Sequence, residues 1–338
     1  VETGLMYAIT KITEFGHTCV KKQELVEYSK KLLDVDGKSI DNAITRLVLA
    51  DKLYLQILDD TECVFRRSFF LAEDNIAKEI ILHTKTNVAK NDYQKYIEKV
   101  SKKNNIELSN EQLEAINMCL NNSISIITGG PGTGKTTIIK CIIDILEQIK
   151  KEYVLCAPTG RAAKRIQETT GKEAKTLHRL LEITKMDDDN LDSLYEIDVT
   201  PISSDFVIVD EASMIDTLMM NNLLKAINVN TQIVLVGDAN QLPSVGPGNI
   251  LNDIISSGVV NTIYLKDIYR QSAKSDIILN AHRVNSGKYP VFKNKDTDMF
   301  FISVKSPDEA INEISSLLTY RLESFANLDV LKDLQVLT

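Results

Sequence analysis

Apolar residues recur at helical spacing through the first part of the chain. Three amphipathic stretches, roughly residues 5–15, 21–33 and 38–50, are separated by GHT and DVDG, which indicate helix ends. Two strand-like runs follow, LYLQIL and CVFRRSFF, joined by the turn DDTE. The pattern predicts a winged-helix-like domain over residues 1–71. Its third helix carries few Arg or Lys residues, so we expect this domain to brace a neighbour rather than read DNA.

The pattern changes after a charged helical segment, residues 72–107, which predicts a connector. From residue 108 to residue 266, helical patterns alternate with the apolar runs SIIT, YVLCAPTG, DFVIVDEAS, QIVLVGD and NTIYL. Short continuous β-branched runs with helices between them predict an α/β fold, a parallel sheet with helices on both faces. Ligands of such sheets bind beyond the carboxyl ends of the strands. Each polar motif described below lies at one of these ends.

Composition limits the class of protein further. The chain has 338 residues, of which 43% are hydrophobic and 25% charged, as expected for two or three globular domains. No apolar run approaches the roughly 18 residues of a membrane helix, and residues 1–20 lack a signal-peptide layout, so we expect a cytoplasmic protein without a membrane partner. The five cysteines form no C-x-x-C pair and the four histidines are scattered, which predicts buried free thiols rather than disulfides or zinc. The net charge of -8 leaves only local basic tracks for nucleic acid, such as GRAAKR at 160–165.

The stretch GGPGTGKT, from Gly129 to Thr136, fits G-x-x-x-x-G-K-[ST] between a predicted strand and a predicted helix. Its glycines let backbone N–H groups face phosphates, and the helix start adds its positive dipole end. We expect Lys135 to reach the β and γ oxygens of ATP and the Thr136 hydroxyl to be a magnesium ligand. The alternative is a glycine-rich turn with a chance lysine. The predicted ATP-binding residues of the loop are Gly130, Pro131, Gly132, Thr133, Gly134, Lys135, Thr136 and Thr137.

Two further motifs complete a hydrolytic site. In FVIVDEAS, Asp210 is expected to hold Mg2+ through water, and Glu211 to polarise the attacking water. Alternatively, the two acids are a cap at a helix start. In QIVLVGDANQLPSVGPG, Gln241 is placed to sense the γ-phosphate or the attacking water, on a loop stiffened by Pro and Gly. The alternative for this loop is a connection with no role. With the phosphate loop, the motifs predict hydrolysis of a nucleoside triphosphate.

The ordered motifs GGPGTGKT, APTGRAAKR, TLHRLL, VIVDEASMID, VGDANQLPSVGPG and IYRQ resemble superfamily 1 DNA helicases of the 5′-to-3′ branch, and the RecD family above all. The resemblance is dense over residues 110–285, and residues 1–105, with EDNIAKEI, are similar to the amino-terminal domain of the stand-alone RecD-like enzymes. It implies a RecA-like motor domain at 108–266. It also implies the start of a second, truncated RecA-like domain at 267–338, including MFFISV and the strand-like LQVLT.

The resemblance also assigns residues at the nucleotide. Gln112 matches an adenine-reading glutamine, although Ser109 and Gln112 also form a capping box, and both roles are compatible. Arg270 matches an arginine delivered to the γ-phosphate, with a surface salt bridge as the alternative. Tyr269 would stack on adenine or fill core. The implied catalytic residues are therefore Lys135, Glu211, Gln241 and Arg270.

On the DNA side, the resemblance implies a hairpin near 183–203 that splits the duplex, but its acidic tip KMDDDNLD departs from what a DNA-contacting wedge should carry. The residues assigned to single-stranded DNA are Pro158, Thr159, Gly160, Arg161, His178, Ser244 and Val245. Alternatively, Arg161 and Lys164 are solvated surface charges, and His178 serves packing or a hydrogen bond.

The function implied is an ATP- and Mg2+-dependent helicase or translocase on single-stranded DNA and duplex junctions, in DNA repair or recombination. Nuclease subunits or a single-strand-binding protein are the implied partners. Because the later family motifs are missing, we expect residues 1–338 to bind nucleotide, to hydrolyse it poorly and not to unwind. The alternatives are a nucleotide-gated docking or binding module of a larger exonuclease complex, a conjugative relaxase helicase, which would need a histidine-rich nicking domain absent here, and a clamp-loader type of ATPase.

Overall fold

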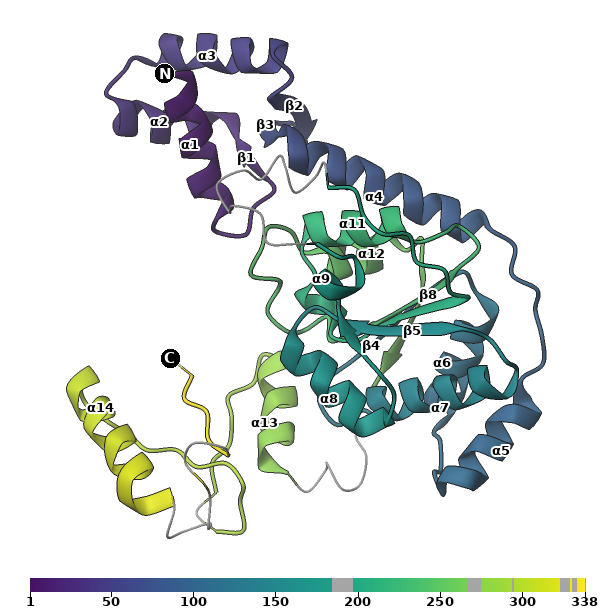
Figure 1. Ribbon diagram of the computed structural model, residues 1–338. Helices are drawn as coiled ribbons and strands as arrows, with labels where there is room; N and C mark the ends of the chain where they lie inside the picture. Colours follow the sequence, from purple (N-terminus) through teal and green to yellow (C-terminus); the bar gives the residue numbers. More distant parts are fainter. Residues whose placement is uncertain (184–196, 267–274, 294, 323–328, 330–332, 338) are drawn as a thin grey trace. The chain divides into compact units, whose positions relative to one another are not determined.

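The computed structural model describes residues 1–183, 197–266, 275–293, 295–322, 329 and 333–337. The chain forms two compact units, Val1–Ser272 and Ala273–Thr338. Figure 1 labels the helices and strands of both units. None of the helices in the described ranges is long and apolar enough to cross a membrane.

The first unit begins with three helices and a small antiparallel sheet. The elements are α1 (Glu2–Thr13), β1 (Cys19–Lys21), α2 (Lys22–Leu33), α3 (Gly37–Leu49), β2 (Leu53–Leu58) and β3 (Thr61–Arg66), with the strand order β1-β3-β2. The three expected helices and the hairpin are present, and β1 is an addition that the apolar pattern did not predict. Leu5, Ile40 and Val64 are fully buried in the core that the helices and sheet share.

The strand predicted over CVFRRSFF is half wrong. The strand β3 stops at Arg66, which pairs with Leu53 at the beginning of β2, so no partner strand exists beyond that point. There the chain turns into α4 (Arg67–Lys85). Phe69 and Ala72 lie on one buried face of that helix and pack with Leu218, from a later part of the chain. Phe69 of RSFF is therefore a core position of a helix, whereas the half-buried Phe70 stacks on Tyr54 of β2, with 4.4 Å between the ring centroids.

The segment predicted as a connector contributes to the core of the α/β part. The helix α4 places Ile76 and Ile80 on one face of the large sheet, and α5 (Gln94–Asn104) places Ile97 and Val100 in the core of the other face. Both helices are amphipathic, so their charged residues lie on the outer side. These helices therefore cover the sheet as well as linking two parts of the chain.

The large sheet confirms the predicted parallel α/β fold. Its strands are β4 (Ile124–Gly129), β5 (Tyr153–Ala157), β6 (Lys175–Thr176), β7 (Phe206–Val209), β8 (Gln232–Gly237) and β9 (Asn261–Leu265). They lie in the order β6-β5-β7-β8-β4-β9, and all neighbours pair in parallel. The two-residue β6 was not predicted, because it is too short to leave an apolar run.

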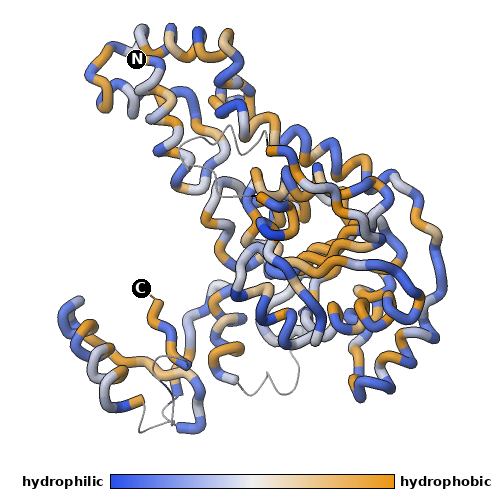
Figure 2. The backbone as a smooth tube through the Cα atoms, in the orientation of Figure 1, coloured by the Kyte–Doolittle hydropathy of each residue, from blue (hydrophilic) through white to orange (hydrophobic). Residues whose placement is uncertain are grey.

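Residues along each central strand alternate between two cores, as the two-residue period of a strand requires. Val207 and Val209 of β7 face one core, and Phe206 and Ile208 face the other. The strands are apolar on both faces, and Figure 2 shows them as the hydrophobic centre of this part of the chain. The helices over one face are α5, α6 (Asn110–Asn121), α7 (Lys135–Gln148) and α8 (Gly160–Thr170), and those over the other are α4, α9 (Leu177–Leu180), α11 (Thr217–Ala226) and α12 (Ile250–Ser257).

The second unit contains α13 (Asp276–Asn285), α14 (Pro307–Ser316) and the π-helical turn η3 (Leu317–Arg321). Among its described residues no strand is formed, so the strand expected at LQVLT is not found at 334–337. A strand needs a neighbour to satisfy its backbone groups, and residues 299–304 do not supply one. The predicted second RecA-like domain therefore stays a prediction.

Candidate active site

Four functional motifs meet at one edge of the large sheet. The strands β5, β7, β8 and β4 are neighbours in that order, and their carboxyl ends precede the APTGR, DEAS, DANQL and GGPGTGKT segments. Two hydrogen bonds join the ends of neighbouring strands. After β7, Asp210 N donates to Cys156 O of β5 at 2.9 Å, and after β8, Ala239 N donates to Thr128 Oγ1 of β4 at 3.0 Å. The expected gathering of the polar motifs beyond the strand ends is therefore seen.

The phosphate loop runs from the end of β4 to the start of α7. Gly132 and Gly134 have φ of +78° and +86°, in the left-handed region where glycine carries no steric penalty. The ammonium group of Lys135 donates to Gly129 O at 2.5 Å and Gly130 O at 3.0 Å. Burial lowers the pKa of Lys135, while the charges of Asp238, Glu211 and Asp210 oppose that shift. The lysine thus lies against the loop that is expected to enclose the phosphates.

Gln112 supports the phosphate loop from α6. The capping box is present: Ser109 N donates to Gln112 Oε1 at 3.1 Å, and Gln112 N donates to Ser109 Oγ at 3.4 Å. The side-chain amide of Gln112 also donates to Thr133 O at 3.2 Å. The side chain is 1% exposed. The capping role is thus seen directly, and the adenine contact stays a prediction.

The acidic pair, Asp210 and Glu211, follows β7 at the same edge of the sheet as the phosphate loop. Burial raises the pKa of Asp210 to about 6, and the neighbouring charge of Glu211 adds to the increase. The charges of Lys135 and Arg165 lower the Asp210 pKa in part. Glu211 has a φ of +53°, a conformation that costs a non-glycine residue backbone energy. The Asp210 carboxyl group therefore lies in a partly dry environment, in which the charges of Glu211 and Lys135 act on it.

The loop after β8 is fixed to its surroundings at several points. The carbonyl of Asp238 accepts from Gln241 N at 3.1 Å, and the Gln241 side chain is exposed. Ser244 is buried, and its hydroxyl donates to Gly246 O at 2.8 Å and Gly248 O at 3.1 Å. The Ser244 hydroxyl thus braces the loop from within, while the adjacent Val245 is 95% exposed.

A second set of contacts connects this loop to the amino-terminal helices. Thr217 N donates to Pro247 O at 3.0 Å, and Gly248 N donates to Gly16 O at 3.0 Å. Gly16 lies directly after α1. The bracing role predicted for residues 1–71 is consistent with this bond between the small domain and the Gln241 loop.

Apart from Ser244 and Val245, the residues assigned to DNA lie at the start of α8 and in α9. The Thr159 hydroxyl caps α8 by accepting from Ala162 N at 3.2 Å. Arg161 and His178 are exposed, Pro158 is half-buried, and Gly160 has open space around its Cβ position. The charge of His178 lowers the pKa of Asp216, which burial raises. The strands β5 and β6 pair directly, so these two segments lie side by side.

Three predicted features lie outside the described residues: Arg270, Tyr269 and the acidic hairpin tip at 185–192. Of the predicted hairpin at 183–203, the described residues 183 and 197–203 form no strand.

The site offers few donors for a metal ion. Among the described residues there is no cluster of three or more His, Cys, Asp or Glu side chains that could hold one. Magnesium usually takes one or two carboxylates and completes its shell with water and phosphate oxygens. Asp210, after β7, and the Thr136 hydroxyl, at the start of α7, follow strand ends at the same edge of the sheet and fit that donor set.

The five cysteines bear on whether the protein has metal or disulfide chemistry. All five cysteines are free, and Cys63, Cys119, Cys141 and Cys156 are buried, as predicted. Cys19 is only half-buried, which corrects its assignment. Burial raises the pKa of Cys156 to about 12, so this thiol beside the acidic pair is not a nucleophile.

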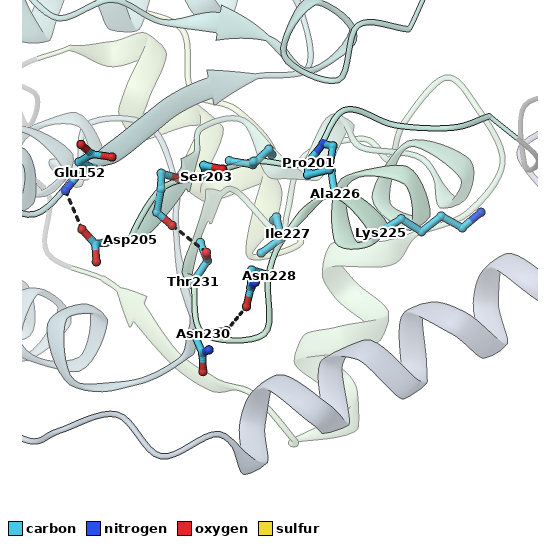
Figure 3. Close-up of a pocket in the computed structure, with 12 residues that line it drawn as sticks. Glu152, Pro201, Ser203, Asp205, Lys225, Ala226, Ile227, Asn228, Asn230 and Thr231 are labelled. Atoms are coloured by element: carbon cyan, nitrogen blue, oxygen red, sulfur yellow. Dashed lines mark hydrogen bonds between the residues drawn. The ribbon is translucent and has the colours of Figure 1, made fainter.

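A polar pocket of about 560 Å³ lies at the opposite edge of the sheet (Figure 3). It is lined by residues before β7 and β8, including Pro201, Asp205, Lys225 and Asn228. None of the predicted site residues lines it. Because parallel α/β sheets bind ligands at the carboxyl edge, this hollow is not the nucleotide site.

Two residues near the site were missed in the sequence. Arg165 Nη1 lies 4.0 Å from Glu211 Oε1, and Asp216 caps α11 by accepting from Met219 N at 2.8 Å. Asp216 could have been recognised as the acid before the apolar helix TLMMNNLL. Arg165 belongs to the basic track GRAAKR, but nothing in the sequence predicted its place beside Glu211, because only the fold brings α8 beside the end of β7.

The chain is similar to known proteins over the part that carries this site. Residues 112–247 match the AAA domain family. The ATP-dependent RecD2 DNA helicase of Deinococcus radiodurans is 38% identical over 196 residues, covering 58% of this chain and 26% of that protein. The RecBCD enzyme subunit RecD of Buchnera aphidicola subsp. Schizaphis graminum is 39% identical over 196 residues, covering 51% of this chain and 30% of that protein.

A crystal structure of Pif1 helicase from Candida albicans aligns with a TM-score of 0.41 and 24% identity, over 64% of this chain and 55% of that chain. The chain spans less than a third of the length of the curated relatives named above. The resemblance to RecD-type helicases is thereby confirmed, and the AAA domain, a P-loop domain, implies nucleotide binding.

Proposed function

We propose that this chain carries the nucleotide-hydrolysing part of an ATP-dependent motor on single-stranded DNA. The observation that carries the proposal is that two motifs lie at one edge of the sheet: the phosphate loop with Lys135, and the acidic pair Asp210 and Glu211. The DNA-side loop leaves the neighbouring strand β5 at the same edge. Nucleotide and strand sites are thus close enough for one to act on the other.

Each side chain has a defined part in hydrolysis. The loop amides and Lys135 bind the β- and γ-phosphates, and the start of α7 adds a favourable dipole. Glu211 accepts a proton from the attacking water, and Gln241 orients that water. Thr136 and Asp210 would hold Mg2+, which neutralises charge that develops on the phosphate oxygens.

Further parts of the proposal rest on the relatives. RecD2 of Deinococcus radiodurans is named an ATP-dependent DNA helicase, which supports DNA translocation by this chain. The 5′-to-3′ direction, duplex junctions, a role in repair or recombination, and Arg270 at the γ-phosphate belong to the same proposal. We also propose that residues 1–338 alone bind nucleotide but do not unwind duplex DNA.

A second candidate function is a nucleotide-gated docking module of a nuclease complex. The observation in its favour is the similarity to RecD of Buchnera aphidicola, which is named a subunit of the RecBCD enzyme. Affinity capture with nuclease subunits, compared with DNA-stimulated activity of the purified protein alone, distinguishes the two functions.

The test of the proposed motor is ATP turnover by the intact protein that carries these residues, with and without oligo-dT. We expect turnover to rise with oligo-dT and to be abolished in Lys135→Ala, with the fold retained by circular dichroism. Normal ATP hydrolysis by Lys135→Ala would show that the role assigned to this lysine is wrong. ATP turnover that is unchanged by oligo-dT would instead favour an ATPase unrelated to DNA.

A further inference from the structure

The helix that leaves the DNA-side loop also reaches the acidic pair. Thr159 caps α8 and Arg161 lies in its first turn, where the single strand is expected. Arg165 is four residues further, so it lies on the same side of the helix as Arg161. Its guanidinium group lies 4.0 Å from the carboxylate of Glu211.

The partner of Arg165 lies at a strained point of the backbone. Glu211 is two residues beyond the end of β7 and has a φ of +53°, a left-handed conformation that the surrounding structure must hold in place. Arg165 is thus the cation that α8 brings to the proposed water-activating carboxylate.

The two motifs are joined at the sheet edge by a backbone hydrogen bond. Asp210 N donates to Cys156 O, two residues before Pro158, at 2.9 Å. Beyond this bond α8 carries both arginines, and the Arg165–Glu211 contact lies one helical turn from Arg161. A strand that fixes the start of α8 would therefore also fix the guanidinium group over Glu211.

We propose that Arg165 is a positioning residue that transmits the occupancy of the single-strand site to Glu211. This inference rests on the proposed function. The ion pair is largely exposed, with 74% of the Arg165 side chain and 22% of the Glu211 side chain accessible. Exposed ion pairs of this kind are weak. Arg165 therefore holds the Glu211 carboxylate only when bound DNA fixes α8, which is what coupling between the two sites requires.

The experiment compares Arg165→Ala, Arg165→Lys and Lys164→Ala in the intact protein. ATP turnover is measured as kcat and KM, each with and without saturating oligo-dT. Lys164 is the matched control, because Lys164→Ala removes one positive charge from the same helix, and Lys164 pairs with Glu168 at 3.8 Å rather than with Glu211. The melting temperature of each variant is measured to confirm that the exposed substitutions leave the fold intact.

For Arg165→Ala we expect the oligo-dT-stimulated kcat to fall about threefold or more, while the unstimulated rate and the KM for ATP stay within about twofold, given the strength of such pairs. Arg165→Lys keeps the charge and restores part of the stimulation, and Lys164→Ala behaves like the unmodified protein.

Full stimulation of Arg165→Ala would overturn the role of Arg165 alone. A raised unstimulated rate of Arg165→Ala would also overturn it, because the arginine would then inhibit Glu211 rather than position it. Failure of oligo-dT to stimulate the unmodified protein would overturn both this role and the proposed function.

Discussion

A Cβ atom at Gly246 would lie 2.3 Å from Oδ2 of Asp216 and 2.9 Å from its Cβ. Asp216 is half-buried and its carboxylate caps α11, so it cannot move away without losing that bond. The loop that carries Gln241 is thus fitted against the helix cap that follows the acidic pair. A residue with any side chain at position 246 must displace one of them.

Gly246→Ala is therefore expected to lower the free energy of unfolding by about 1–3 kcal/mol, the usual cost of overpacking. Urea denaturation measures the change. The control is Gly160→Ala, because nothing lies within 4 Å of a Cβ at that position. Equal stability of the two variants would contradict the close fit between Gly246 and Asp216.

Gln112 has two separable roles, which a pair of substitutions distinguishes. Ser109→Ala and Gln112→Ala both remove the capping box and are each expected to cost about 1 kcal/mol of stability. Only Gln112→Ala also removes the bond to Thr133 O, so only this variant should bind ATP more weakly. A fluorescent ATP analogue measures the affinity; equal affinities of the two variants would show that the brace on the phosphate loop does not matter.

His83 makes stability depend on pH. It is fully buried in α4, neither ring nitrogen has a hydrogen-bond partner in the described structure, and burial lowers its pKa. Because the unfolded chain then binds a proton more readily, stability is lost as the pH falls below the ordinary histidine pKa of about 6.5.

We expect His83→Leu to reduce the loss of stability between pH 7.5 and pH 5.5, measured by urea denaturation at both values. His17→Gln, at an exposed position, serves as the control and should leave the loss unchanged. An unchanged loss in His83→Leu would mean that other groups set this pH dependence.

Arg161 should contribute to binding of single-stranded DNA through a phosphate. Arg161→Ala is expected to weaken binding of oligo-dT and to reduce the salt dependence of log K by roughly 0.7, one contact on a single strand. Lys151→Ala removes the same charge before β5, at the opposite edge of the sheet, and should change neither value. Fluorescence anisotropy over a salt series measures both, and matching slopes for the two variants would place the strand elsewhere.

Much of the fold could be predicted because local patterns agree with it. The β-branched runs became the central strands of the parallel sheet, and GGPGTGKT lies between β4 and α7 as the motif requires. Local patterns failed where tertiary pairing decides. The strand β3 ends at Arg66 because β2 offers no partner beyond Leu53, and β6 is two residues long.

The candidate site shows the same division. Lys135 and Asp210 could be assigned from motifs, since a short sequence carries each chemistry. The contact between Arg165 and Glu211 joins residues 46 positions apart, and it depends on the neighbouring positions of β5 and β7. Asp216 beside Gly246 likewise depends on how the loop folds back on α11. Relationships of this kind follow from topology, which no local pattern contains.

The central claim is that the backbone between Gly129 and Thr136 encloses a triphosphate whose metal ion faces Asp210. A crystal structure of the protein with Mg2+ and a non-hydrolysable ATP analogue tests it most directly. We predict phosphate oxygens within hydrogen-bond distance of the loop amides and of Lys135 Nζ, with the ion between Thr136 and Asp210. An analogue bound at another edge of the sheet, or a loop turned away from the acidic pair, would contradict the account.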